Sequence, residues 1–176
     1  MQLDKLTIKG QEALSKAQSL AAGRGHAVIE PLHLLRALLD QPEGATVPVL
    51  QKLGVGVDAL KAQLDQALAA LPRVSGAVAE PRLGGELSKA LEAAFQSADQ
   101  LKDEYVSTEH LLLGLAASDR DAAGRALREA GVTRDAILKA LQSVRGSAAS
   151  AWSSCPFKAS TVTPSFCNTG TVAPSG

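Results

Sequence analysis

The sequence predicts an all-α fold of about eight helices, arranged as two similar four-helix repeats in one globular domain. Apolar residues make up 45% of the 176 residues but aromatic residues only 3%, so Ala, Leu and Val must build the core. Ala and Leu favour helices, and apolar residues recur every three or four positions, as on one helix face. The third observation is an internal repeat, which decides the architecture.

The repeat is visible when the sequence is shifted by 77 positions, which places the His-Leu-Leu of residues 33–35 onto that of residues 110–112. No gap is needed from residue 11 to residue 67. Each four-helix unit is small for a stable core, so we expect one fused domain related by a pseudo-twofold axis. Its expected limits are residues 1–146, with copies at about 7–70 and 84–145 and a linker at 71–84.

The first helix of each repeat is expected near 7–22 and 85–101, where apolar positions line one face. The second helix begins at the repeated motif. Pro31 suits the first helical position, because its missing N–H costs nothing there, and Ser107 is a good N-cap. These features predict the start of one helix in each repeat.

The third helix is expected at about 46–53 and 121–130. Gly54 and Gly131 follow it directly, as the residues after a helix end often do. The fourth helix is expected at about 57–70 and 134–145.

Two segments lie outside this pattern. Residues 71–85 contain two prolines and three glycines, which predicts a surface loop without a regular element. Residues 147–176 are rich in Ser, Thr, Gly, Ala and Pro and are expected to be a disordered or non-native tail. The tail has no His, Asp or Glu, so its Cys155 and Cys167 are expected to bind no metal and to be structurally idle; a disulfide between them in an oxidising compartment is the alternative.

The overall composition excludes several classes of function. Eighteen Lys and Arg residues balance eighteen Asp and Glu residues, so no net charge favours nucleic acid or an anionic membrane. No apolar run approaches the roughly 18 residues of a membrane span, and the N-terminus lacks the apolar core of an export signal. We expect a cytoplasmic protein. No phosphate-binding glycine motif, His-Glu-x-x-His or Cys-x-x-Cys occurs, so we expect no cofactor, no metal and no catalytic residue.

The three histidines, His26, His33 and His110, are the whole stock for acid–base chemistry near neutral pH. We expect His33 and His110 to pack within their helices and to bind a backbone carbonyl or a first-helix side chain. Both repeats contain this histidine, and packing needs such a residue once per repeat, whereas one catalytic centre rarely needs two copies. The alternatives are a metal site and an acid–base site formed by His110 and Glu109.

Features that occur in one repeat only are better candidates for function. Asp103, Glu104 and Glu109 surround the loop before the second helix of the second repeat, where the first repeat has His26, Ala27 and Leu32. Phe95 likewise stands where the first repeat has Gln18. These residues predict a polar rim beside an apolar groove that contacts polypeptide. The alternative is a solvated loop followed by acids that favour the helix start.

Three segments closely resemble the N-terminal, double Clp repeat domain of the ClpB-type protein disaggregases, a family of AAA+ chaperones. They are MQLDKLTIKGQEALSKAQSLAAGRGHAVIEPLHLLRALLDQ, LDQALAALPRV and STEHLLLGLAA. The resemblance covers residues 1 to about 146, and its motifs are closer to ClpB than to the ClpA and ClpC relatives. After Ser-Val-Arg-Gly the family continues into AAA+ modules, whose nucleotide-binding motifs the present sequence does not contain.

The resemblance implies a monomeric substrate-binding domain, held by a flexible linker above the AAA+ modules of a parent chaperone. Such domains contact unfolded or aggregated polypeptides weakly, through a groove with an apolar floor and an acidic rim. The family motifs assign polar contacts to Thr7, Asp103 and Glu109. The floor is expected from exposed apolar positions nearby, namely Leu91, Phe95 and Leu111.

Alternatives remain at this point. The chain could dock one folded adaptor tightly, as ClpA and ClpC domains do, or support a hexamer without touching substrate. Thr7 could simply be the N-cap of the first helix. If the groove is correct, charge reversal at Asp103 and Glu109 should weaken polypeptide binding without lowering the melting temperature.

Overall fold

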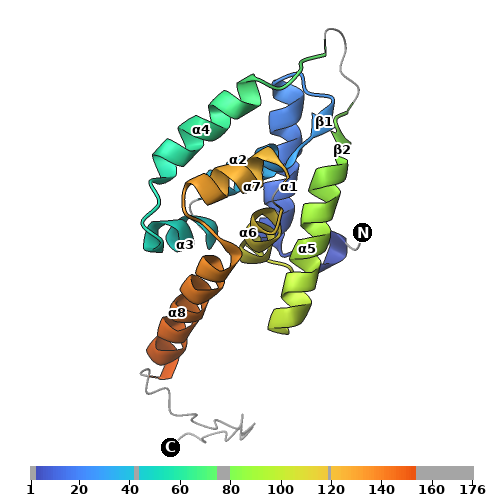
Figure 1. Ribbon diagram of the computed structural model, residues 1–176. Coiled ribbons are helices and arrows are strands. Elements are labelled where there is room, and N and C mark those ends of the chain that lie inside the picture. The colour runs from blue at the N-terminus through green and yellow to red at the C-terminus, as the bar shows by residue number, and fades with distance from the viewer. Residues whose placement is uncertain (1–2, 42–43, 75–79, 119, 154–176) are drawn as a thin grey trace, which may run out of the picture.

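The computed structural model describes residues 3–41, 44–74, 80–118 and 120–153. Within these ranges the chain forms eight α-helices, as predicted, together with a short 3-10 helix at Leu3–Lys5 (Figure 1). The helices are α1 Ile8–Gly23, α2 Pro31–Leu39, α3 Thr46–Lys52, α4 Val57–Ala69, α5 Gly85–Leu101, α6 Thr108–Ala116, α7 Ala122–Glu129 and α8 Arg134–Ser153. None of the described helices is long and apolar enough to cross a membrane.

The two repeats follow the same order, α1–α4 and then α5–α8, and their helices begin and end with matching local signals. Pro31 is at the first turn of α2, and Ser107 is the N-cap of α6, as predicted. Gly54 and Gly131 follow α3 and α7 and both have a φ of +76°, a left-handed conformation that other residues rarely adopt. The sequence signals at these helix ends are therefore confirmed.

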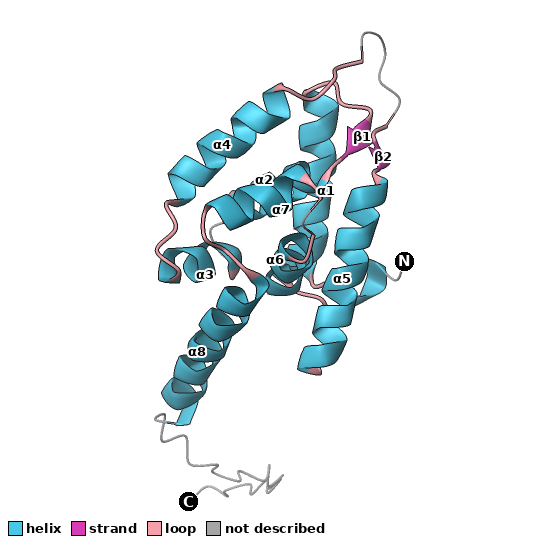
Figure 2. Cartoon of the chain, viewed as in Figure 1, coloured by secondary structure: helices cyan, strands magenta, loops and turns pink. Residues whose placement is uncertain are grey.

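Two short strands connect the repeats, which corrects our expectation of an irregular linker. β1 (Val28–Ile29) precedes α2, and β2 (Arg82–Leu83) lies within the linker and pairs with it in parallel (Figure 2). Gly84 follows β2 and lies so close to β1 that an added Cβ would be 2.8 Å from the carbonyl oxygen of Ile29. Part of the linker therefore forms backbone hydrogen bonds with β1, which its proline and glycine content did not predict.

The same pairing recurs at the pseudo-equivalent position. Leu6 forms an isolated parallel bridge with Val106, and a shift of 77 positions turns this pair into Leu83 and Ile29. In both cases the segment before the first helix of one repeat pairs with the segment before the second helix of the other. The repeats therefore exchange backbone contacts and form one unit.

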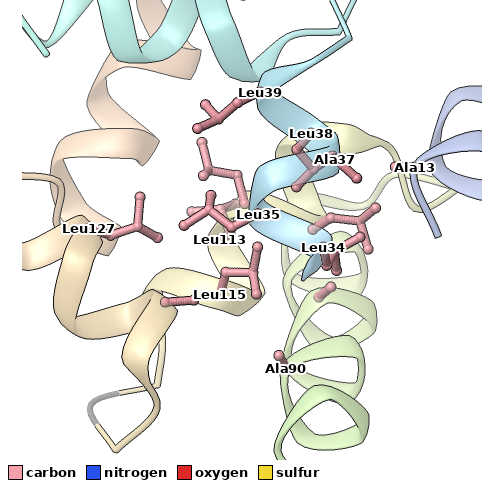
Figure 3. Packing of buried hydrophobic residues seen from close by; sticks show 14 of the residues in the cluster. Ala13, Leu34, Leu35, Ala37, Leu38, Leu39, Ala90, Leu113, Leu115 and Leu127 are labelled. Atoms are coloured by element: carbon pink, nitrogen blue, oxygen red, sulfur yellow. The ribbon is translucent and has the colours of Figure 1, made fainter. Parts of the chain in front are cut away.

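The core is centred on α2 and α6, which carry the repeated His-Leu-Leu motif. Eight of the nine residues of α2 are buried, and seven of the nine in α6. Figure 3 shows leucines of α2 facing Leu113 and Leu115 of α6 and Leu127 of α7. α5 packs most closely on α6, because Gly114 has no Cβ to strike the backbone of Ala90.

The last helix differs from its expected range. We expected it to end near residue 145 and the tail to begin at 147, but α8 continues to Ser153. The run Ser-Ala-Ala-Ser-Ala contains no proline or glycine that would stop a helix. The rest of the expected tail, with Cys155 and Cys167, lies outside the described residues.

Candidate functional site

A groove of about 360 Å³ lies on the second repeat, between α5, the loop that follows it and the N-terminal segment. α5 contributes one face of its last three turns, and the loop contributes the residues that lead to α6. The lining residues are Lys5, Glu92, Phe95, Ala98, Asp99, Asp103, Glu104 and Val106.

The floor of this groove is apolar and its rim is acidic. Ala98 and Val106 are buried, and Phe95 is half-buried, so its ring remains partly open to solvent. Four of the lining side chains are carboxylates, and Lys5 is the lining side chain with positive charge. The groove therefore attracts a ligand with apolar side chains and positive charge.

The structure brings Phe95 and Asp103 together in this groove, but it places Leu91 and Leu111 elsewhere. These two leucines are 1% and 2% exposed and belong to the hydrophobic core, so our expectation of exposed floor residues there is wrong. The helical period explains the error. Residues 87, 91, 94 and 98 of α5 are buried, whereas positions 92, 95 and 99 form an adjacent, more open face.

Neither Thr7 nor Glu109 lines the groove. The Thr7 hydroxyl accepts a hydrogen bond from the N–H of Gly10 at 3.2 Å and caps α1. Its own N–H donates to the carbonyl oxygen of Val106, a floor residue, at 3.0 Å. Glu109 is half-buried in the first turn of α6, where the helix dipole favours an acid.

The repeated histidines are buried, 0% exposed for His33 and 1% for His110, and both bind the start of their own helix. Nδ1 of His33 accepts from the N–H of Glu30, and Nδ1 of His110 from the N–H of Ser107, both at 3.0 Å. We expect a backbone carbonyl as the partner of each histidine from the sequence. The structure instead shows the backbone N–H of the N-cap residue as the partner. A histidine at this position takes the place of Glu or Gln in a capping box.

The other ring nitrogen of each histidine meets a residue from the loop after the first helix, not from the helix itself. Nε2 of His33 lies 2.8 Å from Nδ1 of His26, and Nε2 of His110 lies 3.0 Å from Oδ2 of Asp103. His26 and Asp103 are pseudo-equivalent, so one repeat contains two imidazoles where the other contains an imidazole and a carboxylate. Asp103 therefore contacts the buried His110 and also lines the groove.

Burial and the neighbouring His26 lower the pKa of His33 to about 4. Burial, together with the charge of Arg24, also lowers the pKa of His26. The pair is neutral at neutral pH, which suits packing. In His110 both ring nitrogens are engaged and the ring is buried, so the geometry gives no access to a substrate. Among the described residues no three metal-binding side chains cluster.

Sequence reasoning named Glu104 as part of the rim but missed most of the lining residues, namely Lys5, Glu92, Ala98, Asp99 and Val106. The spacing of Glu92, Phe95 and Asp99 by three and four positions could have identified them as one helix face. No sequence signal joins Lys5 to this face, because the Leu6–Val106 bridge that brings it there is a tertiary contact.

The structure defines an internally duplicated, all-α domain with an acidic groove on its second repeat. A family model described as the Clp repeat (R) N-terminal domain matches residues 5–130, and the chain belongs to this family. The chaperone protein ClpB of Rhodopirellula baltica is 45% identical over 146 residues, which cover 83% of this chain and 16% of that protein. The chain thus spans about one sixth of the length of the curated relative.

Solved structures share this fold. The N-terminal domain of Hsp104 from Candida albicans has the same fold, with a TM-score of 0.70, 23% identity, and coverage of 81% of this chain and 93% of that chain. A ClpV N-domain solved in complex with a VipB peptide has a TM-score of 0.62 and 26% identity, with coverage of 76% and 82%.

Proposed function

We propose that this chain is the substrate-binding N-terminal domain of a ClpB-type chaperone, and that its groove binds unfolded or aggregated polypeptide. The observation that carries the proposal is the partly open ring of Phe95 at the base of a groove with four carboxylates. Support comes from the ClpB relatives and from the peptide complex of the ClpV N-domain. The domain itself, residues 1–146 with the repeats at about 7–70 and 84–145, carries out no chemistry.

Binding of this kind is expected to be weak. The groove presents one aromatic ring and small aliphatic side chains, so it removes little apolar surface from water and selects little by shape. A weak, broad contact suits a cytoplasmic chaperone that must accept and release many segments, while the ATP-driven work belongs to AAA+ modules of the parent protein. The domain is proposed to act as a monomer.

The test is a titration of the full chain with a permanently unfolded, reduced and alkylated polypeptide, followed by fluorescence anisotropy. Phe95→Ala should weaken binding at least severalfold, because the ring is the largest apolar group in the groove. The double variant Glu92→Lys with Asp99→Lys should also weaken it, and increasingly so at low salt.

The matched control is Glu12→Lys with Glu129→Lys, which changes the net charge equally at two exposed acids outside the groove. This control should bind as the unchanged chain does. Equal loss in both double variants would mean that net charge, and not the groove, governs binding, and would overturn the proposal.

An adaptor-docking domain is the second candidate, because the ClpV N-domain complex contains a peptide of one defined partner. The two functions differ in selectivity. A single folded protein bound tightly through this surface, with no affinity for unfolded polypeptides, would favour adaptor docking.

A further inference from the structure

In the first repeat the linker pairs with a loop whose counterpart in the second repeat lines the groove. After α4 the linker passes the loop that follows α1, where Leu71, Pro72 and Val74 line a small pocket together with His26 and Ala27. The equivalents of those two loop residues are Asp103 and Glu104, which line the groove. The residues equivalent to 71–74 are 148–151, which belong to α8, a helix that packs on α3 and α6.

The two loop positions also differ in solvent exposure. The whole residue His26 is 3% exposed, whereas the side chain of Asp103 is 31% exposed. Two loop positions that line the groove, Asp103 and Glu104, thus correspond to two positions of the first repeat beside the described linker residues.

The backbone of the first repeat shows how that polypeptide is held. Three alternate carbonyl groups along the loop and β1 each accept a hydrogen bond from the linker, two of them from residues in and beside β2 and one from Val74. The N–H groups of Val74, Arg82 and Gly84 donate to the oxygens of Gly25, Ala27 and Ile29 at 2.9, 2.9 and 3.0 Å.

In the second repeat this edge is only partly used. The equivalent carbonyl groups belong to Lys102, Glu104 and Val106, and that of Val106 accepts from the N–H of Thr7. Within the described part of the chain, no backbone N–H donates to the carbonyl oxygens of Lys102 or Glu104. The carbonyl oxygen of Lys5, the equivalent of Arg82, accepts from the N–H of Val106 at 2.8 Å, but Lys5 lies in the 3-10 helix and its own N–H does not donate to Glu104.

We propose that the groove binds polypeptide as an extended strand whose backbone N–H groups donate to the carbonyl oxygens of Lys102 and Glu104. The bound strand continues the Leu6–Val106 pairing and places an apolar side chain against Phe95. This inference rests on the proposed function and adds the mode of binding. Recognition through main-chain hydrogen bonds tolerates many sequences, provided that the segment is unfolded and has no proline at the paired positions.

The probe is a soluble peptide, Ala-Arg-Val-Leu-Val-Arg-Ala, in which one backbone amide at a time is N-methylated. Methylation removes a donor without changing the side chain. Affinity should fall about tenfold at two alternate amides, and less than about threefold at the amides between them, which serve as matched controls. In a titration of the isotope-labelled full chain, the carbonyl ¹³C resonances of Lys102 and Glu104 should shift with the unmethylated peptide.

The outcomes separate the mode of binding from the function. If every N-methylated peptide binds equally while Phe95→Ala abolishes binding, side chains alone hold the ligand and the strand proposal is wrong. The strand proposal is also wrong if the unfolded polypeptide binds but the carbonyl resonances of Lys102 and Glu104 do not shift. If neither peptide nor unfolded polypeptide binds, the proposed function fails and the inference fails with it.

Discussion

At the scale of single residues, Thr7 connects helix capping with the groove. Its hydroxyl caps α1, and its N–H fixes the floor residue Val106. Thr7→Ala should lower the free energy of unfolding by about 1 kcal/mol, because the N–H of Gly10 loses its acceptor. Thr7→Ser keeps the hydroxyl and should preserve both stability and polypeptide binding. Denaturant unfolding measures the first effect and anisotropy the second; an unchanged Thr7→Ala midpoint would contradict the capping role.

Asp103 differs from the other carboxylates that line the groove, because its Oδ2 lies 3.0 Å from Nε2 of the buried His110. We therefore revise the expectation that charge reversal here leaves the melting temperature unchanged. Asp103→Lys should lower the melting temperature by several degrees, since it places a cation beside a buried imidazole that has lost its acceptor. Asp103→Asn, which retains an acceptor, should lower it less. Equal melting temperatures for both variants would show that the contact is not stabilising.

The buried imidazoles predict a dependence of stability on pH. The pKa of His33 is lowered to about 4, so between that value and 6.5 the unfolded chain binds a proton that the folded chain excludes. Stability must therefore fall as the pH decreases through this window, on the order of 2 kcal/mol between pH 7 and pH 5 from His33. The positive charge of Arg24 lowers the pKa of both His26 and His33, and that of Arg73 lowers the pKa of His26. Both arginines therefore add to the loss of stability at low pH.

His33→Gln is the matched variant, because glutamine suits the same position of the capping box and does not titrate. Chemical denaturation at several pH values should give a flatter profile for this variant. An unchanged slope between pH 7 and pH 5 would mean that other groups cause the acid sensitivity.

At the scale of elements, the contact between α5 and α6 depends on Gly114. A Cβ at this position would overlap the backbone oxygen of Ala90 and crowd Ala94. Gly114→Ala should therefore push the helices apart and lower the free energy of unfolding by more than about 2 kcal/mol, despite the better helix propensity of alanine. Gly23→Ala is the control, because no atom lies within 4 Å of its added Cβ, and it should leave stability unchanged or slightly raised. Thermal unfolding of both variants checks the prediction.

At the scale of the whole molecule, the exchanged pairs Leu6–Val106 and Ile29–Leu83 make each repeat incomplete without the other. A chain of residues 80–176 alone lacks the partner for Leu83 and the α2 side of the core. We expect such a half-chain to show little helical signal by circular dichroism, and to regain it when mixed with residues 1–79. An independently folded half-chain would sink this expectation.

Much of this protein was determined by local sequence. Eight helices follow from the period of alanine and leucine, the proline at α2 and the glycines after α3 and α7, because helix formation and capping depend on near neighbours. Their division into two repeats follows from the match at a shift of 77 positions. Comparison of the two repeats also singles out Phe95 and Asp103, since a position that differs between the copies is not required by the packing that they share.

The tertiary structure alone decided which of these residues meet. Leu91 and Leu111 look like groove residues in sequence, yet the packing of α5 on α6 buries them. Lys5 reaches the groove, and Asp103 reaches His110, only because chain segments far apart in sequence pair or pack. Whether the described chain pairs with the carbonyl groups of Lys102 and Glu104 is decided in the same way, since it depends on the paths of the linker and of α8. Such contacts come from long-range burial and hydrogen bonding, which no local pattern encodes.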